Sequence, residues 1–76
     1  MAGQQSTRPN HEIGRRLQQA REAAGLTQGR AAGLAGLSTG VNMSRVEAGQ
    51  CLTLQTVAKL CRLYGVSLDA VVWGKQ

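Results

Sequence analysis

The sequence predicts an all-α fold, a compact domain of five short helices, and three observations lead to this prediction. Apolar residues recur at helical spacing in several segments, and a glycine follows each segment. No stretch alternates apolar and polar residues for long enough to indicate a strand. The chain has 76 residues, which suits one domain with one small core and leaves no room for a deep active site.

The first helix is expected to begin near Asn10, because residues 1–9 are polar and offer almost nothing to bury. We therefore predict a flexible N-terminal arm over residues 1–9 and a single domain over residues 10–76. Asn10 is a suitable N-cap, and Gly25 ends the helix. The apolar face at helical spacing consists of Ile13, Leu17, Ala20 and Ala24.

The second helix is expected over about residues 28–35, with Thr27 as its N-cap and Gly36 after its end. Gly29 and Gly33 each cost about 0.5 to 1 kcal/mol in a helix relative to alanine, so packing must hold this segment. These small residues suggest that a neighbouring helix approaches closely here. The predicted buried side consists of Ala31, Leu34 and Ala35.

Three more helices follow the same pattern. The third is expected from a cap at Ser38 or Thr39 to about Ala48, before Gly49. The N-caps and terminating glycines of the fourth and fifth helices are Thr53 and Gly65, then Ser67 and Gly74. Their apolar stripes are Leu54, Val57, Leu60, Cys61 and Tyr64 in the fourth and Leu68, Val71 and Val72 in the fifth.

The charge of the chain favours a polyanionic partner. Nine Lys and Arg against four Asp and Glu give a formal net charge of +5. The only aromatic residues are Tyr64 and Trp73, which disfavours the stacking surfaces that bind single strands and RNA, so double-stranded DNA is the preferred partner. No apolar run approaches the roughly 18 residues of a membrane span, and no signal-peptide core is present. We therefore expect a soluble cytoplasmic protein that contacts no membrane.

Catalysis and metal binding are not expected. Cys51 and Cys61 lie ten positions apart, and His11 is the one histidine, so neither a zinc site nor a CxxC motif is available. No paired carboxylates, no Cys–His or Ser–His set and no phosphate-binding glycine loop can be assembled. We expect a protein that is not an enzyme and needs no cofactor, no metal and no small-molecule substrate.

Two short helices joined by a tight glycine-containing turn, over residues 26–49, form a helix-turn-helix pattern. Its parts are Leu-Thr-Gln at 26–28, Gly-Leu-Ser at 36–38 and Ser-Arg-Val-Glu-Ala-Gly at 44–49, followed by Gly-Val-Ser-Leu-Asp at 65–69. On these residues, the chain resembles the Cro and lambda-repressor family of prokaryotic and phage regulators, including xenobiotic-response-element-like regulators. The resemblance covers residues 13–74 and implies a lambda-repressor-like fold in which the third helix enters the major groove.

The alignment with this family needs one shift. The connection between the second and third helices is one residue longer than the family pattern, and the connection after the third helix is one residue shorter. An alignment without gaps would bury Asn42 and Arg45, and an unpaired buried arginine is very costly. We therefore expect Met43 and Val46 in the core and Arg45 on the outside.

The candidate DNA-binding residues lie on or near the third helix. Arg45 suits a bidentate contact with guanine, and Asn42 or Gln28 suits one with adenine. The alternatives are a phosphate contact or a solvated side chain for Arg45 and a supporting role for Gln28. Apolar contacts with thymine are assigned to Val41 or the methyl group of Thr39. Ser44 either contacts phosphate or only lies beside the helix, and Gln50 is a phosphate contact weaker than a basic residue would be. The remaining candidates are Arg15, Arg16 and Arg30, which contribute a general positive field or are simply solvated.

The resemblance also implies structural and regulatory roles. Arg21 and Glu47 match positions that usually form a buried ion pair between the first and third helices. Independently of the resemblance, Val72 and Trp73 are candidates for a dimer surface, because an apolar tail on a small core often marks an interface; the alternative is that Trp73 covers the core of its own chain. The implied function is a homodimeric transcriptional regulator, a repressor or controller protein that reads a palindromic operator. Two alternatives stay open: an antitoxin-like DNA-binding autoregulator with a protein toxin as partner, and a protein-interaction module with a decayed DNA face.

Overall fold

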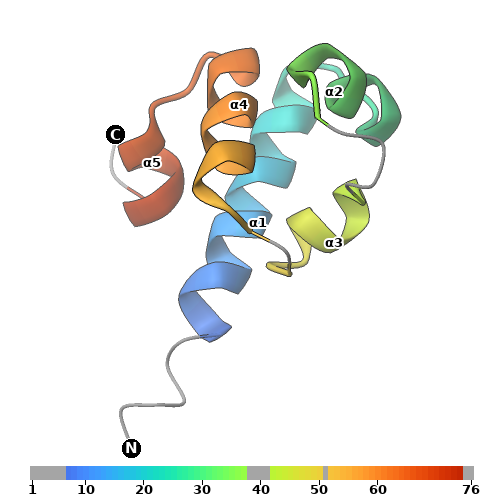
Figure 1. The fold of residues 1–76 in the computed structure, drawn as a ribbon. Helices are drawn as coiled ribbons and strands as arrows, with labels where there is room; N and C mark the ends of the chain where they lie inside the picture. Colours follow the sequence, from blue (N-terminus) through green and yellow to red (C-terminus); the bar gives the residue numbers. More distant parts are fainter. Residues whose placement is uncertain (1–6, 38–41, 51, 75–76) are drawn as a thin grey trace, which may run out of the picture.

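The computed structural model describes residues 7–37, 42–50 and 52–74. This part of the chain contains five α-helices and no strand, which confirms the expected all-α fold (Figure 1). The helices are α1 (Thr7–Ala23), α2 (Gln28–Ala35), α3 (Met43–Glu47), α4 (Leu54–Tyr64) and α5 (Leu68–Trp73). None of these helices has both the length and the apolar character needed to cross a membrane.

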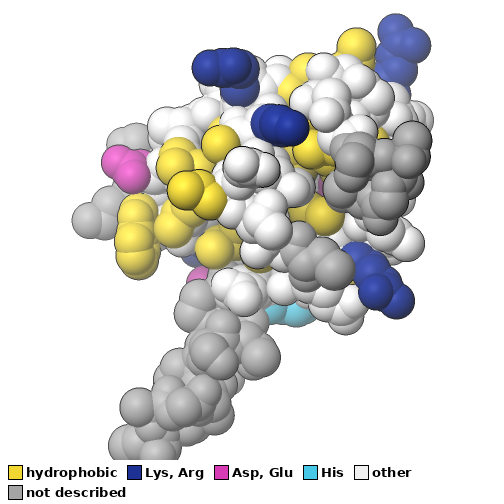
Figure 2. Space-filling model, viewed as in Figure 1, with side chains coloured by type: hydrophobic (Ala, Val, Ile, Leu, Met, Phe, Trp, Pro, Cys, Tyr) yellow, Lys and Arg dark blue, Asp and Glu magenta, His cyan; other side chains and the backbone are white. Residues whose placement is uncertain are grey.

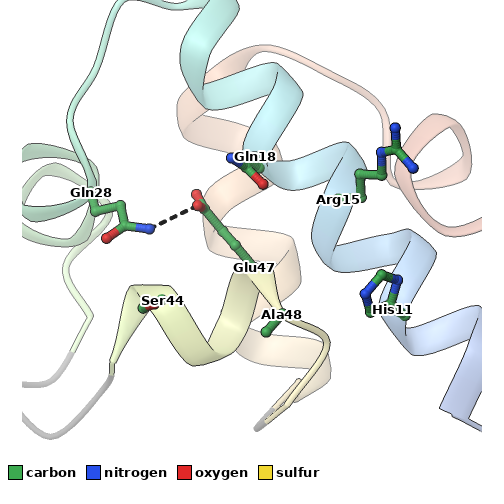
Figure 3. A pocket seen from close by; sticks show the side chains of 7 residues that line it. All are labelled: His11, Arg15, Gln18, Gln28, Ser44, Glu47 and Ala48. Atoms are coloured by element: carbon green, nitrogen blue, oxygen red, sulfur yellow. Dashed lines mark hydrogen bonds between the residues drawn. The ribbon is translucent and has the colours of Figure 1, made fainter.

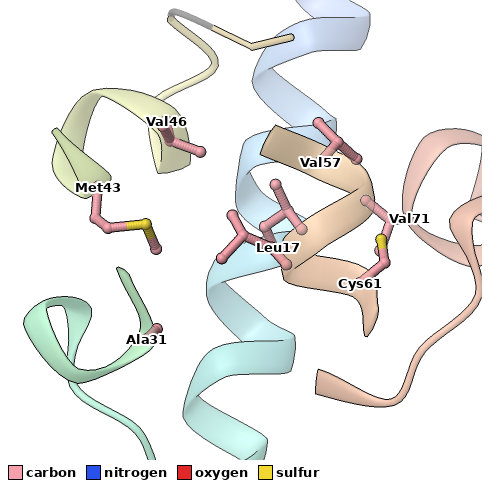
Figure 4. Packing of buried hydrophobic residues seen from close by; sticks show 8 residues of the cluster. Leu17, Ala31, Met43, Val46, Val57, Cys61 and Val71 are labelled. Carbon is pink, nitrogen blue, oxygen red and sulfur yellow. The ribbon is translucent and has the colours of Figure 1, made fainter. Parts of the chain in front are cut away.

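Helix α1 runs through the centre of the domain, with α5 on one side of it and α2 and α3 on the other (Figure 1). It packs against α3, α4 and α5, while α2 packs against α3 and α4. The core lies where these helices meet, and Leu17, Val46 and Leu60 are its largest fully buried side chains. Around them lie Ala31, Met43, Val57, Cys61 and Val71 (Figure 4).

The boundaries of the short helices follow from capping residues. The side chains of Thr27, Thr53 and Ser67 each accept a hydrogen bond from a backbone N–H in the first turn of the helix that follows. At their C-terminal ends, α2, α4 and α5 are each followed by a glycine in the left-handed conformation. The predicted bounds of these three helices are confirmed.

The prediction for the start of the first helix is wrong. Helix α1 begins at Thr7, so Asn10 lies inside the helix and does not cap it. Pro9 does not prevent this start, because it lies in the first turn, where a backbone N–H would have no partner within the helix. At the other end α1 stops at Ala23, and Ala24 is exposed. Residues 1–6 of the predicted arm lie outside the described residues.

The predicted start of the third helix is also wrong. Asn42 has an extended backbone, with φ −103° and ψ 109°, and its side chain caps α3, which therefore begins at Met43. Asparagine can serve this purpose because its side-chain oxygen accepts hydrogen bonds from the N–H groups of the first turn. The expected caps, Ser38 and Thr39, lie outside the described residues.

Three further expectations about packing are corrected. Leu34 and Leu54 are not buried, since 55% and 73% of their surfaces are exposed. Helix α2 buries Ala31 alone, so its buried side is too narrow to include Leu34. Leu54 is the first residue of α4 and lies at the edge of the packed region. Within the described part of the chain, no neighbouring atom lies within 4 Å of a Cβ placed on Gly29 or Gly33, so none of the five helices approaches closely there.

Candidate functional site

Helix α3 has one buried and one exposed side. Met43 and Val46 are buried against the core, while Ser44 and Arg45 are exposed. The expectation that Met43 and Val46 lie in the core and Arg45 on the outside is therefore confirmed. Packing of Met43 and Val46 thus fixes the position of α3, and with it the position of the exposed polar side chains.

Asn42 is exposed, but its side-chain oxygen is already in use. Oδ1 accepts hydrogen bonds from the backbone N–H groups of Ser44 at 2.9 Å and Arg45 at 3.3 Å. A bidentate contact with adenine needs the oxygen and the nitrogen of the amide together. In this arrangement Asn42 acts as the cap that begins α3.

Glu47 is buried at the end of α3, where only 4% of its side chain is exposed. Its two carboxylate oxygens accept hydrogen bonds from Arg21 of α1, from Nε at 2.6 Å and from Nη2 at 3.3 Å. Two parallel bonds of this kind are strong and fix the relative orientation of the two groups. The structure thus joins α1 to α3 through the pair that the family resemblance singled out.

Two more bonds extend this pair to α2. Gln28 donates from Nε2 to Oε1 of Glu47 at 3.0 Å, and Arg21 donates from Nη1 to the carbonyl oxygen of Leu26 at 2.7 Å. The hydrogen bond with Glu47 raises the pKa of Arg21 above its ordinary value, so its charge persists. The amide nitrogen of Gln28, considered above as a reader of adenine, is directed at Glu47 (Figure 3).

Two glycines let the backbones of α1 and the end of α3 meet. A Cβ on Gly14 would lie 2.5 Å from the carbonyl oxygen of Glu47, and one on Gly49 would lie 2.7 Å from Cα of His11. Both distances are shorter than side chains allow, so glycine is required at both positions. The need for glycine at position 14 was not predicted from the sequence. A glycine between the apolar positions Ile13 and Leu17 of a helical pattern could have indicated a close contact.

An open hollow of about 450 Å³ lies between α1, α2 and α3 (Figure 3). Helix α1 contributes His11, Arg15 and Gln18 to its wall, and the other two helices contribute Gln28 and Ser44, with Glu47 at the back. The hollow is polar, and it lies beside the exposed side of α3.

Other candidate residues are more scattered. Arg30 and Gln50 are exposed, on α2 and just after α3, whereas Thr39 and Val41 lie outside the described residues. Near the C-terminus, Val72 is half-buried and 69% of the surface of Trp73 is exposed. In the view of Figure 2, hydrophobic side chains gather over α5 and the adjoining side of α4, while Lys and Arg side chains stand apart from this cluster.

Arg16 has a structural contact that the sequence analysis did not anticipate. Its Nη1 donates to the carbonyl oxygens of Val71 at 3.0 Å and Val72 at 3.3 Å, near the end of α5. A cation at the C-terminal end of a helix satisfies free carbonyl groups and suits the helix dipole. Arg16 therefore fastens α5 to α1, in addition to any general positive field.

Residues 12–72 match a family model described as a helix-turn-helix domain. This match covers most of the chain and includes α2, α3 and the connection between them. The comparisons with curated proteins and with solved structures gave no match.

Proposed function

Because the chain belongs to the helix-turn-helix domain family, we propose that it is a sequence-specific transcriptional regulator that reads double-stranded DNA through the major groove. The observation that supports this best is the outward position of Arg45 on a helix whose other side is locked into the core. A major groove admits an α-helix, and side chains on its exposed face reach the edges of bases.

Arg45 is the principal base-reading residue of this proposal. Its guanidinium has the geometry for two hydrogen bonds to guanine, and it takes part in no ion pair within residues 7–37, 42–50 and 52–74. Ser44 lies beside it, and we assign phosphate contacts to Gln50 and Arg30, which are exposed. Thymine contacts remain assigned to Thr39 and Val41.

Gln28 and Asn42 receive supporting roles in this proposal. Gln28 holds the carboxylate of Glu47, and Asn42 caps the helix that carries Arg45. Both side chains orient α3 through hydrogen bonds that are already formed without DNA. Their substitution is expected to weaken binding by loosening α3, with less effect on base preference than a change at Arg45.

We further propose that the protein acts as a homodimer on a palindromic operator, as a repressor or controller protein. The exposed Trp73 and the half-buried Val72 lie on α5, away from the exposed side of α3, and support this choice of dimer surface (Figure 1). In a two-fold dimer of this kind, half-sites lie about one helical turn apart, roughly 34 Å.

Selection of bound duplexes from a random pool tests the proposed function. The expected result is one enriched site with two inverted half-sites, and an affinity that falls as salt rises. No duplex affinity even at low salt would contradict the proposal and leave a protein-interaction module as the better function. An antitoxin-like function would add a specific protein partner to the DNA binding.

Arg45→Ala tests the base contact. Specific binding to the selected site should weaken by roughly 1 to 3 kcal/mol, with little change in binding to unrelated duplex. Arg62→Ala is a matched control, because Arg62 is an exposed arginine in the last turn of α4. An equal loss on selected and unrelated duplexes would show that Arg45 touches phosphate only.

A further inference from the structure

We propose that the hollow between α1, α2 and α3 is a seat for one phosphate of the DNA backbone, with Arg15 and His11 of α1 on one wall and Ser44 of α3 on another. This inference rests on the proposed function and adds a contact made by a helix outside the helix-turn-helix. In the sequence Arg15 was part of the general positive field, and His11 and Gln18 had no role.

The spacing of these residues on α1 places them on one face. His11, Arg15 and Gln18 follow one another at intervals of four and three residues, so they line one side of a helix. The contacts at Gly14 and Gly49 then bring this side against the end of α3. The polar stripe of α1 and the exposed Ser44 therefore share one hollow (Figure 3).

The carboxylate at the back of the hollow does not oppose a phosphate strongly. Glu47 accepts two hydrogen bonds from Arg21 and one from Gln28, so its charge is paired and its oxygens are turned toward these donors. Arg15, in contrast, takes part in no ion pair among the residues that the structure describes. Arg15 thus brings to the hollow a positive charge that is not paired with any acid of the described residues.

The position of the seat within the hollow follows from a second acid. Gln18 donates from Nε2 to Glu22 at 3.3 Å, and the exposed Glu22 repels a phosphate at that end. The favourable end is the one with His11 and Ser44. In Figure 3 the imidazole of His11 points toward α3, whereas the guanidinium of Arg15 points away from α3. Because Arg15 is exposed, its long side chain can rotate toward a bound phosphate at small cost.

The donors at this end suit phosphate oxygens better than a base edge. A guanidinium, a hydroxyl and an imidazole N–H all donate to phosphate, and a guanidinium does so through two parallel bonds. The hollow lies at the side of α3, next to the surface that carries Arg45. Contacts with the backbone at such a place fix the position of the protein on DNA without reading sequence.

Arg15→Gln tests the seat, with Arg62→Gln as a control that removes the same charge from α4. For wild type and both variants, the affinity for the selected duplex and for an unrelated duplex is measured over a range of salt. Loss of one phosphate contact should make the negative slope of log affinity against log salt less steep, by about 0.9, for Arg15→Gln on both duplexes. Arg62→Gln should keep the wild-type slope. Equal slopes for the two variants would overturn the seat.

A second measurement identifies the phosphate. Methylphosphonate linkages, which remove the charge of one phosphate, are placed singly along the selected duplex. One linkage should weaken binding by wild type and by Arg62→Gln, yet cause no further loss for Arg15→Gln. If every linkage has the same effect on all three proteins, the seat is refuted while the proposed function stands. If wild type binds no duplex at any salt concentration, both fall.

Discussion

Tyr64, at the end of α4, carries a hydroxyl that is buried and has no hydrogen-bond partner among the described residues. Burial raises the pKa of Tyr64 to about 12, and the negative charge of Glu47 adds to this shift. The ordinary value is about 10. The fold therefore favours the neutral phenol, although it gains no hydrogen bond from it.

The consequence is a loss of stability at high pH. The pKa of Tyr64 is higher in the folded than in the unfolded chain. Its ionisation therefore leaves the free energy of unfolding unchanged below about pH 10 and lowers it as the pH rises toward about 12. Tyr64→Phe should remove this part of the pH dependence of the free energy of unfolding, as measured by urea denaturation at several pH values. At neutral pH the variant should be as stable as wild type or more so, since it removes an unsatisfied buried group. An unchanged slope in Tyr64→Phe would contradict this explanation.

Arg21 and Glu47, unlike the Tyr64 hydroxyl, are buried groups that satisfy each other. Removing either one leaves the other as a buried charge without a partner. Arg21→Met should destabilise the domain by about 3 to 5 kcal/mol, since it leaves a buried carboxylate without its cation. Arg21→Met combined with Glu47→Leu should recover most of this loss. Urea denaturation of the two single variants and the double variant gives the coupling energy. A double variant as unstable as the sum of the single ones would show that the pair contributes no mutual stabilisation.

At the scale of the helices, the chain shows which boundaries a sequence can predict. Helices α2, α4 and α5 have a Thr or Ser cap before them and a glycine after them, and these local signals suffice. The start of α1 was placed too late because a polar segment was taken to be outside the helix. The start of α3 was placed too early because Ser38 or Thr39 was taken as the cap, although Asn42 also has the chemistry of a cap.

The candidate site was predictable to a similar extent. The outward position of Arg45 followed from the cost of burying a charge, and Met43 and Val46 are indeed in the core. What the sequence alone did not indicate is the use of Gln28 by Glu47 and the hollow beside α1. Both depend on how closely α1 approaches α3, which is a property of tertiary packing and not of local pattern.

The close approach of α1 to α3 leads to a prediction about glycines in helices. Gly14→Ala should destabilise the domain by about 2 kcal/mol or more, because the added methyl group would meet backbone atoms that cannot move aside. Gly29→Ala in α2 is the matched control. It meets no atom within 4 Å, so it should stabilise the domain by about 0.5 to 1 kcal/mol. Thermal unfolding of both variants measures the difference, and a Gly14→Ala variant as stable as wild type or more stable would show that α1 does not need its glycine.

At the scale of the whole molecule, the arrangement of helices separates two surfaces. The exposed side of α3 carries polar and basic groups, while hydrophobic side chains gather over α5 and the adjoining side of α4 (Figures 1 and 2). Arg16, which lies on α1, bonds to the end of α5 and so fixes the position of α5 against the central helix. A dimer formed through α5 would therefore leave α3 of each copy free. In each copy, α1 would hold α5 in position.

This separation predicts that dimer formation can be impaired without loss of folding or of contact with a single half-site. Trp73→Ser removes an exposed aromatic side chain from α5, and Leu34→Ser removes an exposed leucine from α2, on the other side of α1. If Trp73 anchors the dimer, its substitution should weaken self-association by about 2 kcal/mol or more, whereas the change at Leu34 should have little effect.

Sedimentation analysis gives the association constant, and binding to duplexes with one and two half-sites gives the consequence for DNA. Trp73→Ser should bind one half-site as wild type does and lose the advantage of two. If it retained that advantage, the dimer surface would have to lie elsewhere on the molecule.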